Sequence, residues 1–367
     1  MYIKELEIIN FKNYSDAEIS LSPKINAFVG NNGVGKTNII DAIYYLSFTK
    51  SYFHQTDLLN IKFDTNFFLL KGKYEINNEE INISCGVKKE KKKILKKNNK
   101  EYKKLSEHIG LIPLVMISPG DYTLITGSGD ERRKFIDGVI SQYDRGYLEV
   151  LLKYNKAVQQ RNKLLKQFAE FNNFDKDLLS VYDEQLIENG TVIFEKRKAF
   201  IESLTPVFQK YYNHISSGNE IVEIKYKSEL LEKPFADILE SNIPKDRVVT
   251  YTTSGIHKDD IDFNLGTHSI KKIGSQGQQK TYLIALKLAQ FDFIREKSNT
   301  KPILLFDDVF DKLDSIRVEQ IIKLVIDNNF GQIFMTDANK FRIERILSTI
   351  SEDFKVFEIK NNEANEI

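Results

Sequence analysis

Alternating apolar and polar residues predict strands at the start of the chain. Residues 2–9 follow this period of two, and a turn at 10–13 leads into a second strand near 17–21. Pro23 breaks the pattern before the apolar run 25–29, which we expect to form a third strand. A glycine loop follows, and residues 38–46 have the pattern of a helix. The pattern therefore predicts strand, glycine loop and helix in direct succession.

Residues 66–104 predict an antiparallel meander. Strands are expected at 67–74 and 81–87, followed by a lysine-rich hairpin at 88–104, called the lysine hairpin below. Asn-Asn pairs at 77–78 and 98–99 mark its tight turns, because Asn tolerates the positive φ that such turns require. Since lysines occupy both parities of the hairpin, we expect neither of its faces to be buried in a core.

The lysine hairpin has two open interpretations. It contains ten lysines against two glutamates, a local charge of +8, whereas the whole chain carries +1. Such an edge can simply keep the sheet soluble and prevent edge-to-edge pairing. Clustered lysines can also bind a nucleic-acid backbone by releasing its counterions, without reading sequence. As candidate DNA contacts we take Lys91, Lys93 and Lys97.

From about 130 to 212 the pattern changes to helix. An apolar seam with spacings of three, four and seven residues predicts a first helix, and a polar break at 172–173 separates it from a second. Helices joined in this way should lie antiparallel, and about 35 residues each would span about 50 Å. An ordinary helical subdomain and a projecting arm both fit this pattern.

The last third of the chain returns to strands and a long helix. Strands are predicted at 220–226 and 248–253. Small and polar residues at 274–281, called the signature segment below, open a helix that runs to about 296. The apolar run 302–306 then predicts a buried parallel strand that ends in two aspartates.

Composition narrows the class of protein. A chain of 367 residues can hold one large domain or two medium ones, and 41% hydrophobic residues indicate a folded protein. No apolar run approaches the roughly 18 residues of a membrane span, and the N-terminus lacks the form of a signal peptide. The single cysteine, Cys85, cannot form an intrachain disulfide, and no Cys/His cluster suggests zinc. We therefore expect a cytoplasmic protein without membrane contact.

The glycine loop at 30–37, called the phosphate loop below, has the pattern G-x-x-x-x-G-K-[ST]. Its glycines allow a tight turn in which successive N–H groups point into one concavity, and the following helix adds its positive dipole end. The lysine would reach the β- and γ-phosphates of ATP, and the threonine hydroxyl would ligate Mg²⁺. The candidate ATP-binding residues are Gly30, Asn31, Asn32, Gly33, Val34, Gly35, Lys36 and Thr37.

Two aspartates complete the expected site. Asp307 stands at the carboxyl end of its strand, where Mg²⁺ needs an oxygen partner, so we pair it with Thr37 as a metal ligand. Asp308 would orient or deprotonate the attacking water, and with Lys36 it forms the candidate catalytic pair. Small residues at a helix N-terminus can also approach an anion, which makes Ser275, Gly277 and Gln278 further candidates.

These motifs together resemble the ABC-type ATPase heads of the SMC class, and in detail the RecF family of bacterial recombination-repair proteins. The resemblance covers essentially the whole chain. It rests on IINFKNY at 8–14, GNNGVGKTN at 30–38, ERRKFID at 131–137, QRN at 160–162, SQGQQKT at 275–281 and FDDVFDKLD at 306–314.

The resemblance implies an α/β fold: an ABC-type ATPase head, with a P-loop mixed sheet and an antiparallel β subdomain, into which an α-helical arm domain is inserted. Residues 1–128 would form the N-terminal half of the head with the phosphate loop and the meander. Residues 129–218 would form the helical arm. Residues 219–367 would form the C-terminal half with the signature segment, the Asp307–Asp308 strand and the D-loop.

The resemblance also implies a function in recombinational repair and replication. Two heads would dimerise with ATP between the phosphate loop of one and the signature segment of the other, and would bind duplex DNA near single-strand gaps. The dimer would assist recombinase loading with RecR and RecO, and a weak DNA-dependent ATPase would reset it. Asp308 in place of the glutamate usual in ABC proteins suggests slow turnover.

Two alternatives stay open. An SMC-like chromosome-structural ATPase would have a similar head, but helices of about 35 residues are too short for arms that enclose DNA. A small-molecule kinase could use the same phosphate loop, but the signature segment and the two aspartates count against it. The histidine that usually senses the γ-phosphate in ABC proteins is replaced by Thr336–Asp337, so the sensor is unassigned. The Q-loop of ABC proteins is also unassigned, because the segment around Gly120 contains no matching glutamine.

Overall fold

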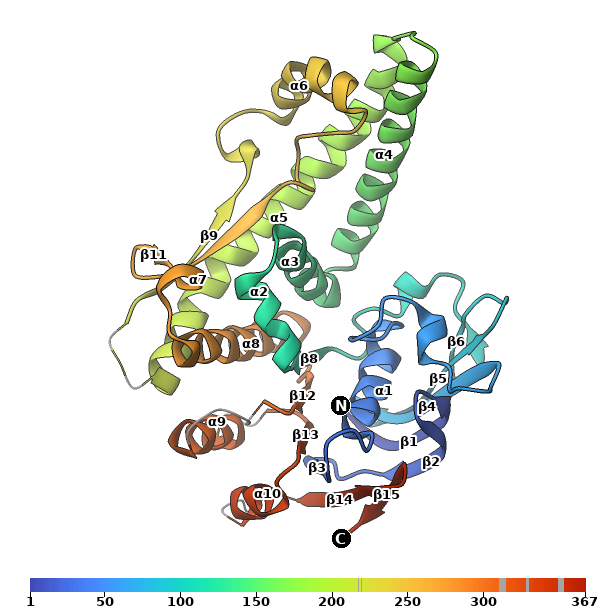
Figure 1. The fold of residues 1–367 in the computed structure, drawn as a ribbon, viewed down its shortest axis with the longest axis vertical. Helices are drawn as coiled ribbons and strands as arrows, with labels where there is room; N and C mark the ends of the chain where they lie inside the picture. The colour runs from blue at the N-terminus through green and yellow to red at the C-terminus, as the bar shows by residue number, and fades with distance from the viewer. Residues whose placement is uncertain (217, 219, 310–314, 328–329, 349–352) are drawn as a thin grey trace. The chain divides into compact units, whose positions relative to one another are not determined.

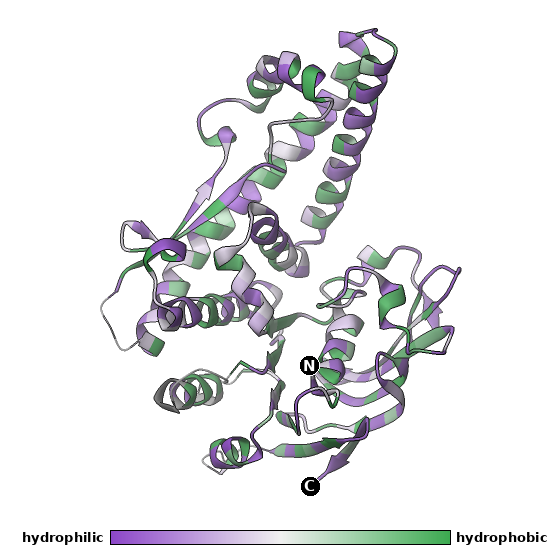
Figure 2. Ribbon diagram, viewed as in Figure 1, coloured by the Kyte–Doolittle hydropathy of each residue, from purple (hydrophilic) through white to green (hydrophobic). Residues whose placement is uncertain are grey.

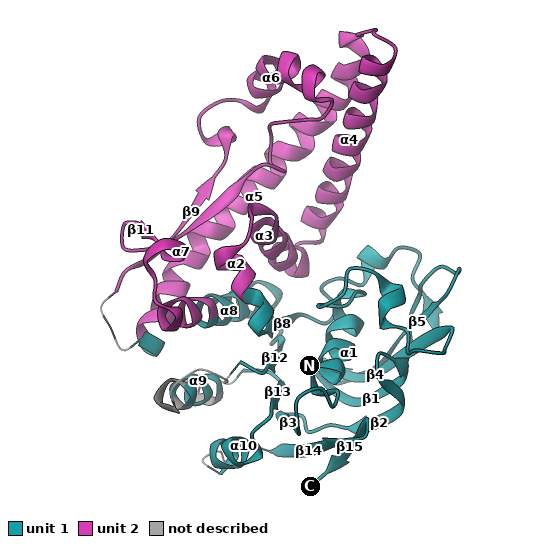
Figure 3. Ribbon diagram, in the orientation of Figure 1, with its two compact units in different colours: residues 1–121, 214–217, 284–367 teal, residues 122–213, 218–283 magenta. Residues whose placement is uncertain are grey.

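The chain folds into two compact units (Figure 3). The computed structural model describes residues 1–367 except 217, 219, 310–314, 328–329 and 349–352. Unit 1 consists of Met1–Asp121, His214–Ser217 and Ile284–Ile367, and unit 2 consists of Tyr122–Asn213 and Gly218–Leu283. Within the described residues, no helix is both long and apolar enough to cross a membrane.

One sheet of unit 1 is antiparallel, with strand order β2-β1-β4-β5-β6-β7. The predicted turns are confirmed: both Asn pairs have positive φ and join directly paired strands. Two short 3-10 helices, η1 (Asp57–Asn60) and η2 (Leu105–Glu107), accompany this sheet. The strands are β1 (Tyr2–Phe11), β2 (Tyr14–Ser20), β4 (Phe67–Ile76), β5 (Glu79–Lys88), β6 (Ile94–Lys97) and β7 (Lys100–Glu101).

The prediction that neither face of the lysine hairpin would be buried is wrong. Leu95 in β6 is only 1% exposed and belongs to the same core cluster as Cys85, its direct partner in β5. Six of the ten lysines lie outside the strands. Their odd and even positions therefore do not correspond to the two faces of a strand. The hairpin therefore has one face in the core and one face outward.

The second sheet of unit 1 has the order β15-β14-β3-β13-β12-β8, and all of its pairs except β14–β15 are parallel. Its strands β3, β8, β12 and β13 are buried along their whole length, as expected for a parallel sheet with both faces covered. The strands are β3 (Ile25–Val29), β8 (Leu114–Ile117), β12 (Ile303–Asp307), β13 (Ile333–Asp337), β14 (Phe354–Lys360) and β15 (Glu363–Glu366).

Helix α1 (Lys36–Phe48) packs against both sheets of unit 1. It contacts β1, β4 and β5 of the antiparallel sheet and β8, β12 and β13 of the parallel sheet. It is buried on more than one side, which fits the mostly apolar run that follows the phosphate loop. Unit 1 also contains η3 (Pro119–Tyr122) up to Asp121, α9 (Ser315–Asp327) and α10 (Lys340–Leu347).

Unit 2 contains the predicted pair of long helices. Helices α4 (Arg145–Glu170) and α5 (Lys176–Ser216) lie side by side and mix hydrophilic with hydrophobic residues along their length (Figures 1 and 2). Ion pairs join Asp144 to Lys196 and Arg161 to Asp183, so position increases along one helix as it decreases along the other. The antiparallel pairing is confirmed, with 26 and 41 residues in the two helices.

The rest of unit 2 is a small antiparallel sheet with short helices. The sheet has the order β11-β10-β9. Helix α8 begins in this unit and continues into unit 1. The elements are α2 (Thr123–Thr126), α3 (Gly129–Tyr143), β9 (Val222–Lys227), η4 (Glu229–Leu231), α6 (Phe235–Val249), β10 (Asp260–Leu265), β11 (His268–Ser269), α7 (Ile270–Ile273) and α8 (Gln276–Ser298).

The strand predicted at 248–253 is absent from this part of the structure. Val248 and Val249 form the end of α6, and Thr250 ends that helix with φ 62. Backbone N–H groups that a strand would pair with a neighbour are instead bound by side chains: Thr252 by Asn162, and Thr253 by Asp246. The run of β-branched residues was misleading because tertiary contacts decide strand pairing.

The domain boundaries stay a prediction. The compact unit that holds the long helices also takes in Gly218–Leu283, because β9 and β10 belong to it. The signature segment therefore lies in unit 2 up to its last residue, Thr281, and the phosphate loop lies in unit 1.

Candidate nucleotide site and signature segment

Backbone conformation explains the glycines of the phosphate loop. Gly30, Gly33 and Gly35 have φ of 149°, 82° and 110°, in the region that favours glycine. A Cβ atom on Gly30 would lie 2.7 Å from the carbonyl oxygen of Ile359, and one on Gly35 would lie 2.6 Å from Nδ2 of Asn13. Both positions therefore exclude a side chain for conformational and steric reasons.

Lys36 is held inside the loop that precedes it. Its Nζ donates to the carbonyl oxygens of Gly30 at 2.7 Å and Asn31 at 2.8 Å, and the side chain is almost fully buried. Burial lowers the pKa of Lys36, while the charges of Asp308, Asp307 and Asp337 raise it. The ammonium group is thus positioned by the loop and surrounded by acidic groups.

Asparagines support the loop from outside. Asn13 donates through Nδ2 to the carbonyl oxygen of Val34 at 3.4 Å and accepts through Oδ1 from Nδ2 of Asn38 at 2.6 Å. Tyr14 donates its hydroxyl to the carbonyl oxygen of Gly35 at 3.3 Å. The turn between β1 and β2 therefore buttresses the phosphate loop, a role that the sequence motif IINFKNY does not reveal by spacing alone.

Thr37 and Asp307 lie in direct contact. Thr37 Oγ1 donates to Oδ1 of Asp307 at 2.8 Å, and Thr336 Oγ1 donates to the same oxygen, also at 2.8 Å. Burial raises the pKa of Asp307, and these two hydrogen bonds lower it. Thr336 also accepts from the backbone N–H of Asp308 at 2.9 Å. Two predicted metal ligands, 270 residues apart in the chain, are thus neighbours.

A pocket of about 290 Å³ opens where these groups meet. Six of the ten residues predicted in the phosphate loop and at 307–308 line it, together with Asn38 and Thr336, which were not among the candidate site residues. Gly30, Asn31, Val34 and Asp307 are not among the lining residues, although Asp307 accepts a hydrogen bond from Thr37, which is. The lining residues are Asn32, Gly33, Gly35, Lys36, Thr37, Asn38, Asp308 and Thr336.

The sequence placed Thr336 only at the position of the missing sensor histidine and gave it no role, although a signal for one was present. The apolar run 333–335 precedes it, and β13 pairs in parallel with both β12 and β3, so Thr336 lies directly opposite Asp307. Carboxyl ends of adjacent parallel strands share one edge of a sheet, where ligands bind in open α/β folds. Residues 333–335 are a third apolar run beside 25–29 and 302–306, so the polar residue that follows them was a candidate for the nucleotide site.

The residues of the pocket fit a nucleoside triphosphate with a divalent cation. The glycine backbone conformations and the start of α1 at Lys36 form a concave set of N–H donors beside an ammonium group. A hydroxyl and a carboxylate in contact with each other offer the oxygen ligands that Mg²⁺ prefers. Thr37 and Asp307 would hold the cation, and the phosphate loop would hold the phosphates.

The signature segment begins α8 with reciprocal caps. The backbone N–H of Ser275 donates to Oε1 of Gln278 at 2.8 Å, and the N–H of Gln278 donates to Oγ of Ser275 at 3.2 Å. This is the capping box of a helix N-terminus. Ser275 is exposed, and Gly277 between the caps is half-buried. Gln278 is also held by Glu220, which accepts from its Nε2 at 2.7 Å.

Neighbouring side chains brace this helix start. Gln279 donates to the carbonyl oxygens of Ile270 and Gly274 and accepts from the hydroxyl of Tyr122. Lys271 in α7 donates to the carbonyl oxygen of Thr126 at 2.5 Å. The signature segment therefore rests on hydrogen bonds within unit 2.

The candidate DNA contacts have different surroundings. Lys91 is exposed and Lys97 is half-buried. Lys93 is only 15% exposed: its Nζ lies 2.7 Å from a carboxylate oxygen of Asp57 and donates to the carbonyl oxygen of Thr49 at 2.6 Å. These internal contacts count against Lys93 as a DNA contact, and DNA contact by any of the three lysines stays a prediction.

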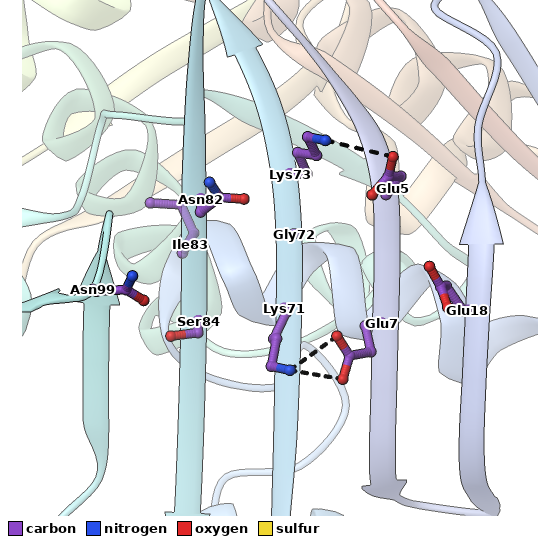
Figure 4. A pocket seen from close by; sticks show the side chains of 10 residues that line it. All are labelled: Glu5, Glu7, Glu18, Lys71, Gly72, Lys73, Asn82, Ile83, Ser84 and Asn99. Atoms are coloured by element: carbon purple, nitrogen blue, oxygen red, sulfur yellow. Dashed lines mark hydrogen bonds and ion pairs between the residues drawn. The ribbon is translucent and has the colours of Figure 1, made fainter.

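A second hollow, of about 310 Å³, lies on the outer face of β1, β4 and β5. Figure 4 shows Lys71 bonded to Glu7 and Lys73 beside Glu5, with Glu18 further along the same face. Its carboxylates disfavour a polyphosphate. The smaller pocket, at the phosphate loop, is therefore the better candidate for a triphosphate site.

Comparison with known proteins identifies the family. The family model described as "RecF/RecN/SMC N terminal domain" matches residues 2–362. The "DNA replication and repair protein RecF" of Phocaeicola vulgatus is 49% identical over 100% of this chain and 98% of its own length. That of Flavobacterium johnsoniae is 50% identical over 98% of this chain and 100% of its own. The chain belongs to the RecF family.

Solved structures agree with this assignment to the RecF family. A structure of the recombination mediator protein RecF-ATP in the RecFOR pathway is 30% identical, with a TM-score of 0.91 over 100% of this chain and 97% of that chain. An SMC head domain from Pyrococcus furiosus is 17% identical with a TM-score of 0.58, over 100% of this chain and 96% of that chain. The ABC-type ATPase head predicted from the motifs is therefore confirmed as the fold.

Other RecF-family motifs of the chain have structural roles. Arg132 in the ERR motif forms a bidentate contact with the carboxylate of Asp260, at 2.6 and 2.9 Å. Arg161 in the QRN motif is fully buried between Asp183 and Asp246. These pairs join separate segments of unit 2. Residues 310–314 of the FDDVFDKLD motif lie outside the described residues.

Proposed function

We propose that this protein binds ATP and Mg²⁺ at the phosphate loop and uses the bound nucleotide to close a dimer on DNA. The observation that carries the proposal is that Lys36, Thr37, Asp308 and Thr336 line one pocket, with Asp307 hydrogen-bonded to Thr37. Relatives in the RecF family are named DNA replication and repair proteins, and the similar solved structure is one of RecF-ATP.

ATP would be held by backbone and charge together. The N–H groups of the loop and of the first turn of α1 would bind phosphate oxygens, and Lys36 would exchange its contacts to Gly30 and Asn31 for the β- and γ-phosphates. Bound Mg²⁺ would neutralise charge between these phosphates. Thr37 and Asp307 supply its protein ligands in this proposal.

Hydrolysis is proposed to be slow and DNA-dependent, so that it acts as a switch. Asp308 lines the pocket and has φ 50°, which turns it away from the line of β12. Its carboxylate would orient the attacking water. Thr336, which donates to Asp307 and accepts from the N–H of Asp308, positions both aspartates.

The second half of the site would come from a partner copy. We propose that the exposed N-terminus of α8, with Ser275, Gly277 and Gln278, contacts the γ-phosphate held by the phosphate loop of the other copy. Only a closed dimer can use this attraction, so ATP binding and dimerisation are coupled. Each site combines two different surfaces, and a two-fold dimer forms both sites at once, so its interface is isologous.

The proposed partners are duplex and gapped DNA, RecR with RecO, and the recombinase that they load. The similar RecF-ATP structure belongs to a protein of the RecFOR pathway, which supports this assignment, as do the relatives named for DNA replication and repair. Exposed lysines of the lysine hairpin supply sequence-independent contacts to phosphates.

The SMC-like chromosome-structural ATPase remains the second candidate, with the SMC head as its supporting likeness in fold. Helix α4 has 26 residues, a span of about 39 Å, which is short for an arm that encloses DNA.

Sedimentation of the purified chain with and without ATP, Mg²⁺ and gapped duplex tests the proposal. We expect dimers only with ATP and a further shift with DNA, and release after hydrolysis. A chain that stays monomeric with ATP and DNA would contradict the proposed switch. DNA binding that ignores nucleotide would favour an ATP-independent role.

A further inference from the structure

The outward face of β4, β5 and β6 carries an apolar row at one end. Ile9, Leu69, Gly86 and Ile94 lie directly opposite one another across four strands. Their inward neighbours are buried in the core, so the row faces outward, and Ile94 is 42% exposed. Phe67, two positions before Leu69 on the same face, is also 42% exposed.

A second exposed phenyl ring lies a few residues before this row in the sequence. Phe63 is 90% exposed and lies in the segment that leads into β4. The ends of this segment are fixed by backbone hydrogen bonds, from Lys62 N to Asn10 O at 2.8 Å and from Lys89 N to Asn66 O at 3.0 Å. Two exposed rings are therefore presented by anchored backbone beside the start of the lysine hairpin.

Exposed lysines border the rings. Lys88 is the direct cross-strand partner of Phe67, and the turn that follows is closed by a hydrogen bond from Lys91 N to Lys88 O at 3.1 Å. Lys88, Lys89, Lys91 and Lys92 are all exposed, and within the described part of the chain none of them forms an ion pair. Glu90 is the one acid among these five consecutive positions.

The opposite end of the same face carries three carboxylates. Glu5, Glu7 and Glu18 line the hollow of Figure 4, and two of them are paired with Lys73 and Lys71. An acidic peptide would need a pocket for its apolar anchor, and this hollow is lined by carboxylates. The rings and lysines instead offer flat, open surfaces beside positive charge.

We propose that Phe63, Phe67 and the lysines at 88, 89, 91 and 92 form a binding site for single-stranded nucleic acid. Unpaired bases stack on the two phenyl rings, and the lysines hold the backbone phosphates. A duplex keeps the faces of its bases stacked inside the helix, so it uses the lysines but not the rings. The inference rests on the proposed contact between the lysine hairpin and DNA, and it adds the two phenylalanines on which unpaired bases would stack.

A single fluorophore tests stacking directly, because the chain contains no tryptophan. In Phe67→Trp the new indole would be quenched by an oligothymidylate of about 12 nucleotides and not by a duplex of equal length. Phe341→Trp is the matched control, since Phe341 is 81% exposed on α10 of the same unit. Absence of quenching, or equal quenching in the control, would overturn the proposal.

Affinity measurements separate base stacking on the phenylalanines from phosphate binding by the lysines. Phe63→Ala with Phe67→Ala should weaken single-strand binding by about tenfold or more, and should change duplex binding by less than about twofold. Lys88→Glu with Lys91→Glu and Lys92→Glu should weaken both. If the phenylalanine substitutions leave single-strand affinity unchanged while the lysine substitutions lower it, stacking is refuted and the lysine contact stands. If neither set of substitutions changes affinity, the proposed contact between the hairpin and DNA is refuted as well.

An acidic polymer provides the remaining comparison. Polyglutamate should bind weakly, because it has no rings to stack. Its affinity for the double phenylalanine variant should equal its affinity for the unsubstituted chain. Loss of polyglutamate binding in that variant, without loss of oligothymidylate binding, would assign the surface to an acidic protein segment and overturn the proposal.

Discussion

Lys36 is the residue whose substitution tests the nucleotide site most directly. Its ammonium group is held at the mouth of the phosphate loop by two carbonyl oxygens, ready to exchange them for phosphate. Lys36→Met should lower ATP affinity by at least about 100-fold, because charged hydrogen bonds contribute about 1.5–3 kcal/mol each. Calorimetric titration measures this, with Lys323→Met as an exposed control. Unchanged affinity would refute the assignment of the loop.

Asp308 tests the chemical step separately from binding. Asp308→Asn should keep ATP and Mg²⁺ binding within about threefold and reduce hydrolysis by about 100-fold, since removal of a general base typically costs about 10²–10⁴. Asparagine also tolerates the φ of 50° at this position, so the backbone should be preserved. Single-turnover phosphate release gives the rate. Normal hydrolysis would place the water-orienting role on another group.

We expect Lys93 to contribute to stability more than to DNA binding, because its charge is paired inside the protein. Its ammonium group lies over the ring of Tyr45 as well as against Asp57. Lys93→Met should lower the free energy of unfolding by about 1–2 kcal/mol, because partly buried acceptors lose their donor. Urea denaturation measures the loss, and DNA affinity should change by less than about twofold. A selective loss of DNA affinity would return Lys93 to the DNA contacts.

At the scale of elements, the lysine hairpin combines a packed strand with exposed turns. Leu95 ties β6 to the core, and before it Lys88, Lys89, Lys91 and Lys92 are exposed. Lys88→Glu with Lys91→Glu and Lys92→Glu should weaken duplex binding for any sequence. The slope of log affinity against log salt should fall by about one for each lost phosphate contact. An unaltered slope would leave the hairpin as a solubilising edge.

At the scale of the whole molecule, mixed variants test whether the signature segment acts on the partner's nucleotide. Ser275→Arg should block the exposed start of α8, and Lys36→Met should disable the phosphate loop, so each variant alone is inactive. In a heterodimer one site combines both defects and the other is intact. An equal mixture should recover about a quarter of normal ATPase, because about half of the dimers carry one good site of two.

The controls for the mixture are the two pure variants. If Ser275 served the phosphate loop of its own chain, every site in the mixture would stay inactive. If both sites must act together, the mixture would form ATP-dependent dimers without hydrolysis. Sedimentation of the mixture distinguishes these cases, because the first predicts no gain in dimer over the pure variants.

The sequence by itself determined the parts of this protein whose signals are local. The phosphate loop, the start of α1 and the hairpin turns at the Asn pairs follow from glycine or asparagine at positions that need positive φ. The buried strand before Asp307 and the antiparallel pair α4–α5 follow from apolar periodicity. Each of these signals lies within a few residues or a few helical turns.

Only the tertiary structure decided which distant side chains meet. Thr336 reaches Asp307 because β13 pairs with β12. Lys93 points inward because it donates hydrogen bonds to Asp57 and to the carbonyl oxygen of Thr49. Residues 248–253 are not a strand because Asp246 and Asn162 bind their backbone. Local propensity differs between such alternatives by about 1 kcal/mol or less per residue, and burial or a charged hydrogen bond exceeds it.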